Sequence, residues 1–262
     1  KLAFISNQLT SVTIPDSVTT IGRQAFGINN LTSVTIPDSV TSIGDSAFYT
    51  NQLTSVTIPV GVTNLSGVFS SNKITSVTIP DGVTNITFAF HYNQLTSVTI
   101  PDSLTSIGRF AFNENNLTSV TIPDSVTSIG DNAFANNQLA SVTIPANVTS
   151  IDESAFGFNN LISVLFLGER PEIVEDSFDA NPLEIVAYCT GKDGWPGASI
   201  EGITAVADCD GDGALDEDDL FPKDASESLD TDADGTGNNA DTDDDGDGVV
   251  DDQDVFPLDA TE

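Results

Sequence analysis

Apolar and polar residues alternate in short stretches that recur through the first 185 residues. In residues 29–50, Val34 and Ile36 are apolar, and Ser33 and Thr35 alternate with them. A period of two residues is typical of a β-strand that buries one face. A proline follows at once and ends the strand, because it has no N–H to donate to a neighbouring strand. The pattern therefore predicts a strand over residues 31–36 with Ser and Thr facing solvent.

The second half of the same stretch predicts a compact return of the chain. Val40 and Ile43 form a second short apolar pair after the turn that follows the proline. A Gly-Asp turn comes next, and Ala47 and Phe48 then supply apolar side chains for a core. Asn51 opens the next copy of the pattern. Each copy is too small to bury its own apolar face and must pack against its neighbours.

The repeat keeps a nearly fixed period. Its phenylalanine is spaced by 22 residues, except for two successive intervals of 21 that end at Phe69 and Phe90. A period of this size predicts a solenoid, here of about nine coils of 21–22 residues. Parallel strands lie about 4.8 Å apart, so nine coils would form a rod of roughly 40 Å with a column of stacked rings. The phenylalanines are Phe4, Phe26, Phe48, Phe69, Phe90, Phe112, Phe134, Phe156 and Phe178.

An asparagine recurs three residues after each phenylalanine. Buried polar groups must be paired, and an amide can satisfy the backbone groups of a tight turn. We therefore assign these residues a structural role and expect them to lie inside the coils. They are Asn7, Asn29, Asn51, Asn72, Asn93, Asn115, Asn137, Asn159 and Asn181.

The motif Leu-Thr-Ser-Val-Thr-Ile-Pro, followed by Val-Thr-Ser-Ile-Gly and Ala-Phe, resembles the BspA-like leucine-rich repeats of bacterial surface proteins. The resemblance covers residues 1–185 and implies a mainly β, right-handed leucine-rich-repeat solenoid. It also implies an exported bacterial protein, extracellular or on the outer cell surface, in a family partly used for adhesion and host contact. We interpret the chain as a piece of a longer exported protein.

Residues 186–207 depart from the repeat and predict a C-terminal cap and junction. Terminal repeats must cover the open end of a solenoid, and we expect Trp195 to act as the lid. Cys189 and Cys209 are the only cysteines. An exported context favours a disulfide between them, which would fasten the cap to the following segment. The alternative is two unpaired thiols.

Residues 208–262 form an acidic module with 22 Asp and Glu and one Lys. Three copies of Asp-x-Asp-x-Asp-Gly continue with Asp or Asn at positions 9 and 12, the spacing of a calcium loop with oxygen ligands. A disordered acidic tail, the alternative, leaves the fixed glycine unexplained. The Phe-Pro pairs and the lack of Glu at position 12 resemble bacterial thrombospondin type 3-like calcium repeats, which implies an irregular chain wrapped around Ca²⁺. The predicted ligands are Asp208, Asp210, Asp212, Asp216, Asp219, Asp230, Asp232, Asp234, Asn238, Asp241, Asp243, Asp245, Asp247, Asp251 and Asp254.

Composition limits the function. Seven Lys and Arg against 40 Asp and Glu argue against nucleic acid as a partner, and no apolar run reaches membrane-spanning length. With a single histidine and no catalytic arrangement around it, we expect no enzyme. We favour a monomeric adhesion or recognition rod on a calcium-stiffened stalk, with an extracellular protein or glycan as ligand. A structural spacer, and ice binding by the Ser-x-Thr rows, are the alternatives.

Recognition is expected where the repeats vary. Large and diverse residues gather in two columns beside the phenylalanine, on predicted loops of a rigid scaffold. The two 21-residue intervals predict a kink or shallow recess there, near Tyr49, Lys73, His91 and Tyr92. Packing of the tyrosines on neighbouring turns is the alternative. The recognition candidates are Tyr49, His91, Tyr92, Arg109, Phe110 and Phe158.

Overall fold

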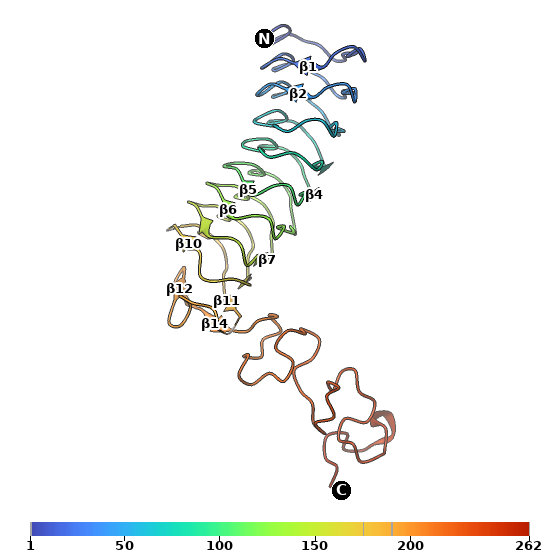
Figure 1. The fold of residues 1–262 in the computed structure, drawn as a ribbon, viewed down its shortest axis with the longest axis vertical. Coiled ribbons are helices and arrows are strands. Elements are labelled where there is room, and N and C mark those ends of the chain that lie inside the picture. The colour runs from blue at the N-terminus through green and yellow to red at the C-terminus, as the bar shows by residue number, and fades with distance from the viewer. Residues whose placement is uncertain (1, 175, 190, 262) are drawn as a thin grey trace.

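The structure is a computed structural model that describes residues 2–174, 176–189 and 191–261. About eight coils stack into a parallel solenoid, and an irregular C-terminal segment follows it (Figure 1). The predicted mainly β solenoid is thus confirmed. The first repeat is not a full coil, since Phe4 is 49% exposed. One 3-10 helix, η1 (Asp251–Gln253), is the only helix among the described residues.

The strands are short and fall into two columns. One column follows the Ser-x-Thr motif, which we call the strand face: β3 (Ser76–Thr78), β4 (Ser97–Thr99), β7 (Ser141–Ile144), β9 (Ser163–Phe166) and β11 (Ile185–Tyr188). The other lies just before the phenylalanine: β1 (Thr20–Ile21), β2 (Ser42–Ile43), β5 (Ser106–Ile107), β6 (Ser128–Ile129), β8 (Ser150–Ile151) and β10 (Glu172–Ile173). All pairs between coils in these columns are parallel and in register with the repeat, for example Ser76 with Ser97.

The strand predicted for residues 31–36 does not form. No backbone hydrogen bond joins residues 33–36 to 11–14 or to 55–58 in the described part of the chain, and residues 119–122 also lie outside any strand. Ile36 and Ile58 are still buried. The alternating pattern therefore identified the buried face correctly, but several rows of the strand face lack a backbone ladder over these residues. The sheets on this face are β3–β4 and β7–β9–β11–β14.

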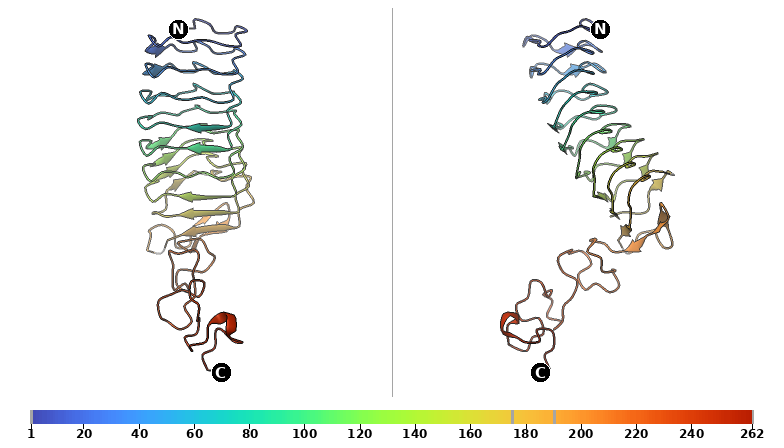
Figure 2. Two further views of the ribbon diagram at one scale, coloured as in Figure 1. Left: turned by 90° about the vertical axis from the view of Figure 1, so that its right-hand side faces the viewer. Right: turned by 180° about the vertical axis from the view of Figure 1, so that it is seen from behind.

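The coils are tied together more continuously beside the phenylalanine column. The Gln24, Phe26 and Ile28 amides donate to Asp45, Ala47 and Tyr49 of the next coil at 2.9 to 3.0 Å, and similar bonds recur along the stack. We call this side of the solenoid the loop edge. The stack is bowed rather than straight (Figure 2).

The predicted aromatic column is confirmed. Successive rings from Phe4 to Phe178 stack with centroids 5.2 to 5.9 Å apart and planes within 18°. The separation is 5.9 Å in three consecutive steps from Phe48 to Phe112, which include both 21-residue intervals. The shortened coils therefore coincide with a looser part of the stack.

The asparagines form the second internal column, as predicted, except at its ends, where Asn7 is exposed and Asn181 is half-buried. Asn29, Asn51, Asn72, Asn93, Asn115, Asn137 and Asn159 are buried. The pattern at Asn51 is typical: its Nδ2 donates to the Phe26 and Phe48 carbonyls, and its Oδ1 accepts from the Leu31 amide. Each amide thus joins two coils through backbone groups that would otherwise be buried without a partner.

The cap closes the C-terminal end of this core. Trp195 is fully buried, stacks on Tyr188 with centroids 5.4 Å apart, and donates from Nε1 to the Gly168 carbonyl at 3.1 Å. It therefore acts as the predicted lid. Three further strands complete the cap: β12 (Ser199–Ile200), β13 (Ile203–Thr204) and β14 (Val206–Ala207). β14 pairs with β11. The disulfide joins Cys189, directly after β11, to Cys209, two residues after the end of β14.

Candidate functional site

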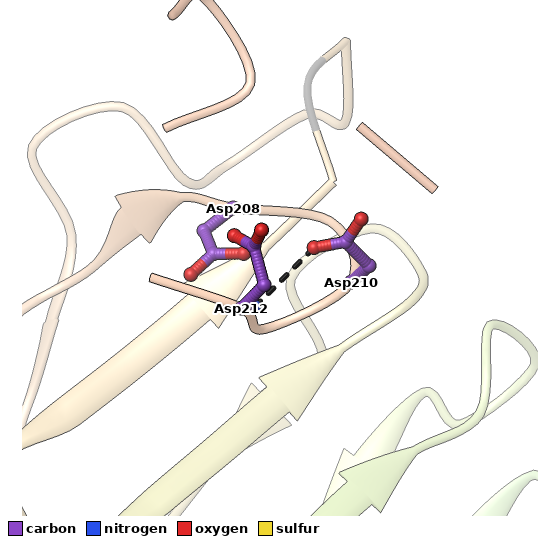
Figure 3. Close-up of side chains that lie close together, drawn as sticks. All are labelled: Asp208, Asp210 and Asp212. Carbon is purple, nitrogen blue, oxygen red and sulfur yellow. Dashed lines mark hydrogen bonds between the residues drawn. The ribbon is translucent and has the colours of Figure 1, made fainter. Parts of the chain in front are cut away.

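Each acidic repeat gathers its first three aspartates. Ligand oxygens of Asp208, Asp210 and Asp212 lie within 4.8 Å of one another, and Figure 3 shows these three side chains around one turn of the chain. The equivalent residues of the second and third repeats form the same triad. These residues are Asp230, Asp232 and Asp234, then Asp243, Asp245 and Asp247.

The glycine at position 6 explains how the triad forms. Gly213, Gly235 and Gly248 have φ of +102°, +94° and +95°, a left-handed region that favours glycine. This turn aims each glycine amide at the aspartate of position 1, with N···Oδ2 distances of 3.0 to 3.2 Å. In every copy, the amide at position 7 also donates to the aspartate at position 5 at 2.7 Å. Three segments with the same spacing of aspartates and glycine therefore adopt one loop geometry.

The later predicted ligands act mainly on the backbone of their own loops. At position 9, Asp216, Asn238 and Asp251 each accept a hydrogen bond from the amide at position 2, at 2.6 to 2.9 Å. At position 12, Asp219 and Asp254 accept from the amide two residues further on, at 2.8 and 2.9 Å. The triads are thus brought together directly, whereas positions 9 and 12 shape the loops.

The position 12 residue Asp241 makes the same kind of hydrogen bond, and because its donor lies in the next loop, the bond also links two loops. It accepts a hydrogen bond from the Asp243 amide at 3.1 Å, at the first residue of the third loop.

The triads contain carboxylate oxygens that a cation would satisfy. Asp210 Oδ2, Asp230 Oδ1, Asp243 Oδ1 and Asp245 Oδ2 are buried and have no hydrogen-bond partner among the described residues. Burial, followed by the like charges of the neighbouring aspartates, raises the pKa of Asp210. Buried and unpaired carboxylates are unfavourable without a positive partner. This donor set consists of hard oxygens and fits Ca²⁺.

Two acidic residues outside the predicted set also lie in this region. Asp244 Oδ1 is buried without a partner, and Glu227 is buried and accepts from the Asn239 amide at 3.0 Å. Burial and then the charge of Asp251 raise the pKa of Asp244, with smaller effects from Asp241, Glu227 and Asp232. The second and third loops are thus close in space. For Asp244, the available signal in the sequence was its place between Asp243 and Asp245, in a run of three consecutive acidic residues.

Four of the six recognition candidates come together on the loop edge, where they surround a residue outside the candidate set, Phe88. Phe88 and Phe110 stack with centroids 5.0 Å apart and planes 6° apart. His91 meets Phe88, Phe110 and Tyr92 edge-on, at 6.0, 5.5 and 4.3 Å. The Arg109 guanidinium lies 5.5 and 5.4 Å from the Phe88 and Phe110 centroids. We call these five residues the aromatic cluster.

The other two candidates lie elsewhere. Tyr49 packs on the preceding coil, where a Cβ at Gly27 would overlap its ring. This is the alternative considered for the tyrosines. Phe158 is 53% exposed and has no ring contact in the described part of the chain. The cluster therefore contains two of the candidate aromatics together with His91 and Arg109.

The loop edge has a repeated backbone signature. Two residues of each coil have φ between +50° and +68°, although most are not glycine. The first of these columns includes Gln24, Ser46, Gly67, Phe88, Phe110, Asn132 and Ser154. The second includes Ile28, Thr50, Ser71, Tyr92, Glu114, Asn136 and Phe158. The variable columns of the sequence are thus largely positions of left-handed backbone.

The electrostatics of the cluster are local. Burial lowers the pKa of His91, and Glu114 and Asn113 partly offset this effect. His91 Nδ1 is buried and unpaired among the described residues. Arg109 Nε lies 4.0 Å from Asp131 Oδ2, with both side chains largely exposed. Arg109 therefore has a nearby charge but no close hydrogen bond to it.

The strand face is hollowed rather than flat. A hollow of about 530 Å³ lies between the row of Ser55 and Thr57 and the row of Ser76 and Thr78, with exposed Val60 at its margin. A second, of about 290 Å³, lies between residues 119–122 and β7. In each hollow, one of the lining rows (residues 55–58 or residues 119–122) lies outside any strand. These gaps interrupt the regular Ser-x-Thr lattice that ice binding would need.

Comparison with known proteins identifies the repeats. The family profile described as "BspA type Leucine rich repeat region" matches six copies over residues 1–88 and 87–192. No curated protein matches the chain. Among the described residues, no helix is long and apolar enough to cross a membrane. The match stops before the acidic module, where calcium binding stays a prediction.

Solved structures with the same kind of repeat include a leucine-rich repeat protein from Bacteroides ovatus, at 21% identity over 78% of this chain and 68% of that one, with a TM-score of 0.44. A leucine rich cell surface protein from Faecalibacterium prausnitzii is 23% identical over 68% and 80%, with a TM-score of 0.38. A leucine-rich repeat protein from Eubacterium ventriosum is 23% identical over 72% of this chain and 63% of that one, with a TM-score of 0.45. On the strength of the family profile, which covers most of its length, the chain belongs to the BspA-type leucine-rich repeat proteins.

Proposed function

We propose that this chain is a non-enzymatic recognition module of a bacterial surface protein, a leucine-rich-repeat rod displayed on a calcium-stiffened stalk. The aromatic cluster is the observation that carries the proposal. It places Tyr92, 52% exposed, against His91, and Arg109 against Phe110, on one rigid edge of the solenoid. Tyrosine and arginine are enriched among residues that dominate binding energy, whereas serine and threonine are not. The loop edge is thus better suited to recognition than the strand face.

The repeat architecture supports a display role. The Phe and Asn columns fix each coil to the next, so side chains on the loop edge are held on a rigid scaffold. Binding residues are commonly found on loops that a rigid scaffold positions. The bacterial surface-protein character of the family agrees with this role.

Calcium binding is the second part of the proposal. The acidic module carries a net charge of −21 over residues 208–262, from 22 acidic residues and one lysine. Without cations, repulsion between these carboxylates opposes a compact form, and the module has little apolar core to resist it. The three triads would hold Ca²⁺ through positions 1, 3 and 5. Extracellular calcium modules bind at about 10⁻⁴ to 10⁻³ M, which suits millimolar calcium outside cells.

Binding assays test the recognition part. Immobilised extracellular matrix proteins and a glycan array, probed with the whole chain in calcium, would provide a partner. Tyr92→Ala should weaken that binding at least tenfold, while the matched pair Thr57→Ala and Thr78→Ala on the strand face should leave it unchanged. The opposite ranking would move recognition to the strand face. No binding at all would favour the spacer alternative.

Hydrogen exchange tests the calcium part. Chelation should strongly reduce protection of residues 208–261 and leave the solenoid protected. Asp245→Asn, which alters a buried carboxylate whose Oδ2 has no described partner, should weaken calcium binding as measured by calorimetry. Asp252→Asn is the matched control, because Asp252 is exposed in the same loop. Unchanged protection after chelation would refute calcium binding.

A further inference from the structure

The two stacked phenylalanines of the aromatic cluster occupy backbone positions that do not favour them. Phe88 and Phe110 have φ of +55° and +54°. A left-handed backbone brings the Cβ of any residue but glycine close to the following carbonyl, and Asn and Gly tolerate it best. Neighbouring coils place Gly67 and Asn132 at the equivalent position. Coil formation therefore does not explain two large aromatic residues here.

The strain suggests another role for the pair. Residues held in unfavourable backbone regions cluster at binding and active sites, where the surrounding structure maintains them. Both phenylalanines are only half-buried, and the coils on either side fold with small or polar residues in their place. The aromatic pair is thus an exposed feature added to the regular loop edge.

The stacked pair of rings ends at Phe88. The 5.0 Å separation of Phe88 and Phe110 matches the spacing of the coils, so the two rings stack along the solenoid axis. Phe88 stacks on no second ring among the described residues. The equivalent position of the preceding coil is Gly67, which has no side chain, and the coil before that carries the small Ser46. A flat group can therefore approach Phe88 from that side.

Hydrogen-bond donors surround the rings. The Arg109 guanidinium lies beside both phenylalanines, and its only described charged partner, Asp131, is 4.0 Å from Nε. A guanidinium offers five N–H donors. The half-exposed Tyr92 phenol is joined to the group through His91. The ligand should thus combine an apolar flat face with several acceptor oxygens.

The negative charge of the chain further limits the chemical class of the ligand. The net charge is −33, and Asp131 and Glu114 lie next to the cluster. A polyanion would meet repulsion both at a distance and on contact. A pyranose meets the remaining requirements, because its C–H face carries slight positive charge that suits the negative face of an aromatic ring, and its hydroxyl groups accept hydrogen bonds.

We propose that the aromatic cluster binds a neutral pyranose residue of a glycan, with the sugar stacked on Phe88 and hydrogen-bonded by Arg109. This inference rests on the proposed recognition function and specifies its ligand. A protein partner that inserts an aromatic side chain is the competing outcome, which the experiment below separates.

The experiment uses the whole chain in saturating calcium and four hexasaccharides as probes: β-1,4-linked glucose, xylose and mannose, and α-1,4-linked galacturonic acid as the acidic control. Saturation-transfer NMR identifies the bound sugar protons, and calorimetry gives the affinity. At least one neutral hexasaccharide should bind, with transfer concentrated on the C–H protons of one ring face. The acidic control should bind more weakly or not at all.

Variants locate the site. Phe88→Ser with Phe110→Ser should weaken binding at least tenfold and leave the solenoid folded, because serine occupies the same position at Ser46 and Ser154. Ile28→Ser is the matched control, since Ile28 is an exposed left-handed apolar residue in another coil and serine occupies its equivalent position at Ser71, and it should leave binding unchanged.

Three results would overturn the glycan assignment: no binding of any neutral hexasaccharide at millimolar concentration, preference for the acidic one, or equal losses in the control and the double variant. If an immobilised protein still bound and Tyr92→Ala still weakened it, the recognition function would stand without its glycan ligand. Loss of binding only in the strand-face variants would refute both proposals.

Discussion

Removal of one internal asparagine should weaken the solenoid much more than its small side chain suggests. Asn137 Oδ1 accepts from the Leu117 amide at 3.0 Å, and Nδ2 donates to the Phe112 and Phe134 carbonyls at 2.9 and 3.0 Å. All of these groups are buried. Asn137→Ala deletes these three hydrogen bonds, of which those to Leu117 and Phe112 join neighbouring coils, and a longer fourth one from Nδ2 to the Ala135 carbonyl at 3.3 Å.

The cost is unequal among the three partners. The Phe112 and Phe134 carbonyls each keep a second donor, from Asn115 and Asn159 respectively. The Leu117 amide has no other described partner. A buried donor left unsatisfied costs about 1–3 kcal/mol, and each lost hydrogen bond contributes about 1 kcal/mol net. We therefore expect Asn137→Ala to destabilise the solenoid by about 3–5 kcal/mol.

The measurement needs a global and a local probe, because repeat proteins can unfold in parts. Urea denaturation in saturating calcium gives the overall change in the free energy of unfolding. Hydrogen exchange should show lost protection in the peptide that contains Leu117. Asn160→Ala is the matched control, since Asn160 is exposed and its side chain makes no described hydrogen bond.

The two variants should therefore differ clearly. If Asn137→Ala and Asn160→Ala lie within about 0.5 kcal/mol of each other, the surface range for single substitutions, the asparagine column does not clamp the coils. Unchanged exchange at Leu117 would also mean that the column is not a clamp. Either result would shift the main stabilisation to the stacked rings.

Three further predictions concern other parts of the chain. Replacing Cys189 and Cys209 by serine should cost about 3 kcal/mol, the chain-entropy estimate for a loop of this size, and urea denaturation with and without reductant checks this. Burial lowers the pKa of His91, so neutral His91 supports the fold above pH 6.5 and this support is lost as the pH falls. His91→Gln should therefore reduce the change in melting temperature between pH 7.5 and pH 5. The same pH dependence in the variant and the parent chain would contradict this prediction. Ile28→Asn should raise the free energy of unfolding of the solenoid, measured by urea denaturation, by about 1 kcal/mol, because a β-branched residue at φ +53° is strained. A lower free energy of unfolding would mean that packing of Ile28 outweighs the strain.

The architecture could be predicted from the sequence because each constraint is repeated many times. A single phenylalanine or asparagine would be ambiguous, but the same residue every 21 or 22 positions can satisfy all copies only by stacking. Trp195 was identifiable because it stands alone in the segment that must close the stack. The pairing of the Ser-x-Thr rows was not predictable. Alternation shows which side chains are buried, but not whether adjacent backbones come close enough to bond.

The candidate sites show the same limit at closer range. The spacing of aspartates and glycine predicted the acidic triads, since each triad is local to one loop. Asp244 and Glu227 depend on contact between different loops, which spacing does not reveal. Likewise, the sequence placed Phe110 in a variable column but could not show its stacking on Phe88. It also left open whether Tyr49 would join a site or cover Gly27.

The disulfide has a mechanical consequence. A pulling force applied through the C-terminal segment reaches Cys209 and passes directly to Cys189 at the end of β11. The loop between the cysteines, which contains Trp195, β12, β13 and β14, lies outside this covalent path and carries no tension. The load therefore enters the solenoid through β11 and passes to the neighbouring strands β9 and β7 of the same sheet. Under flow or traction, the lid can stay seated while the tether is stretched.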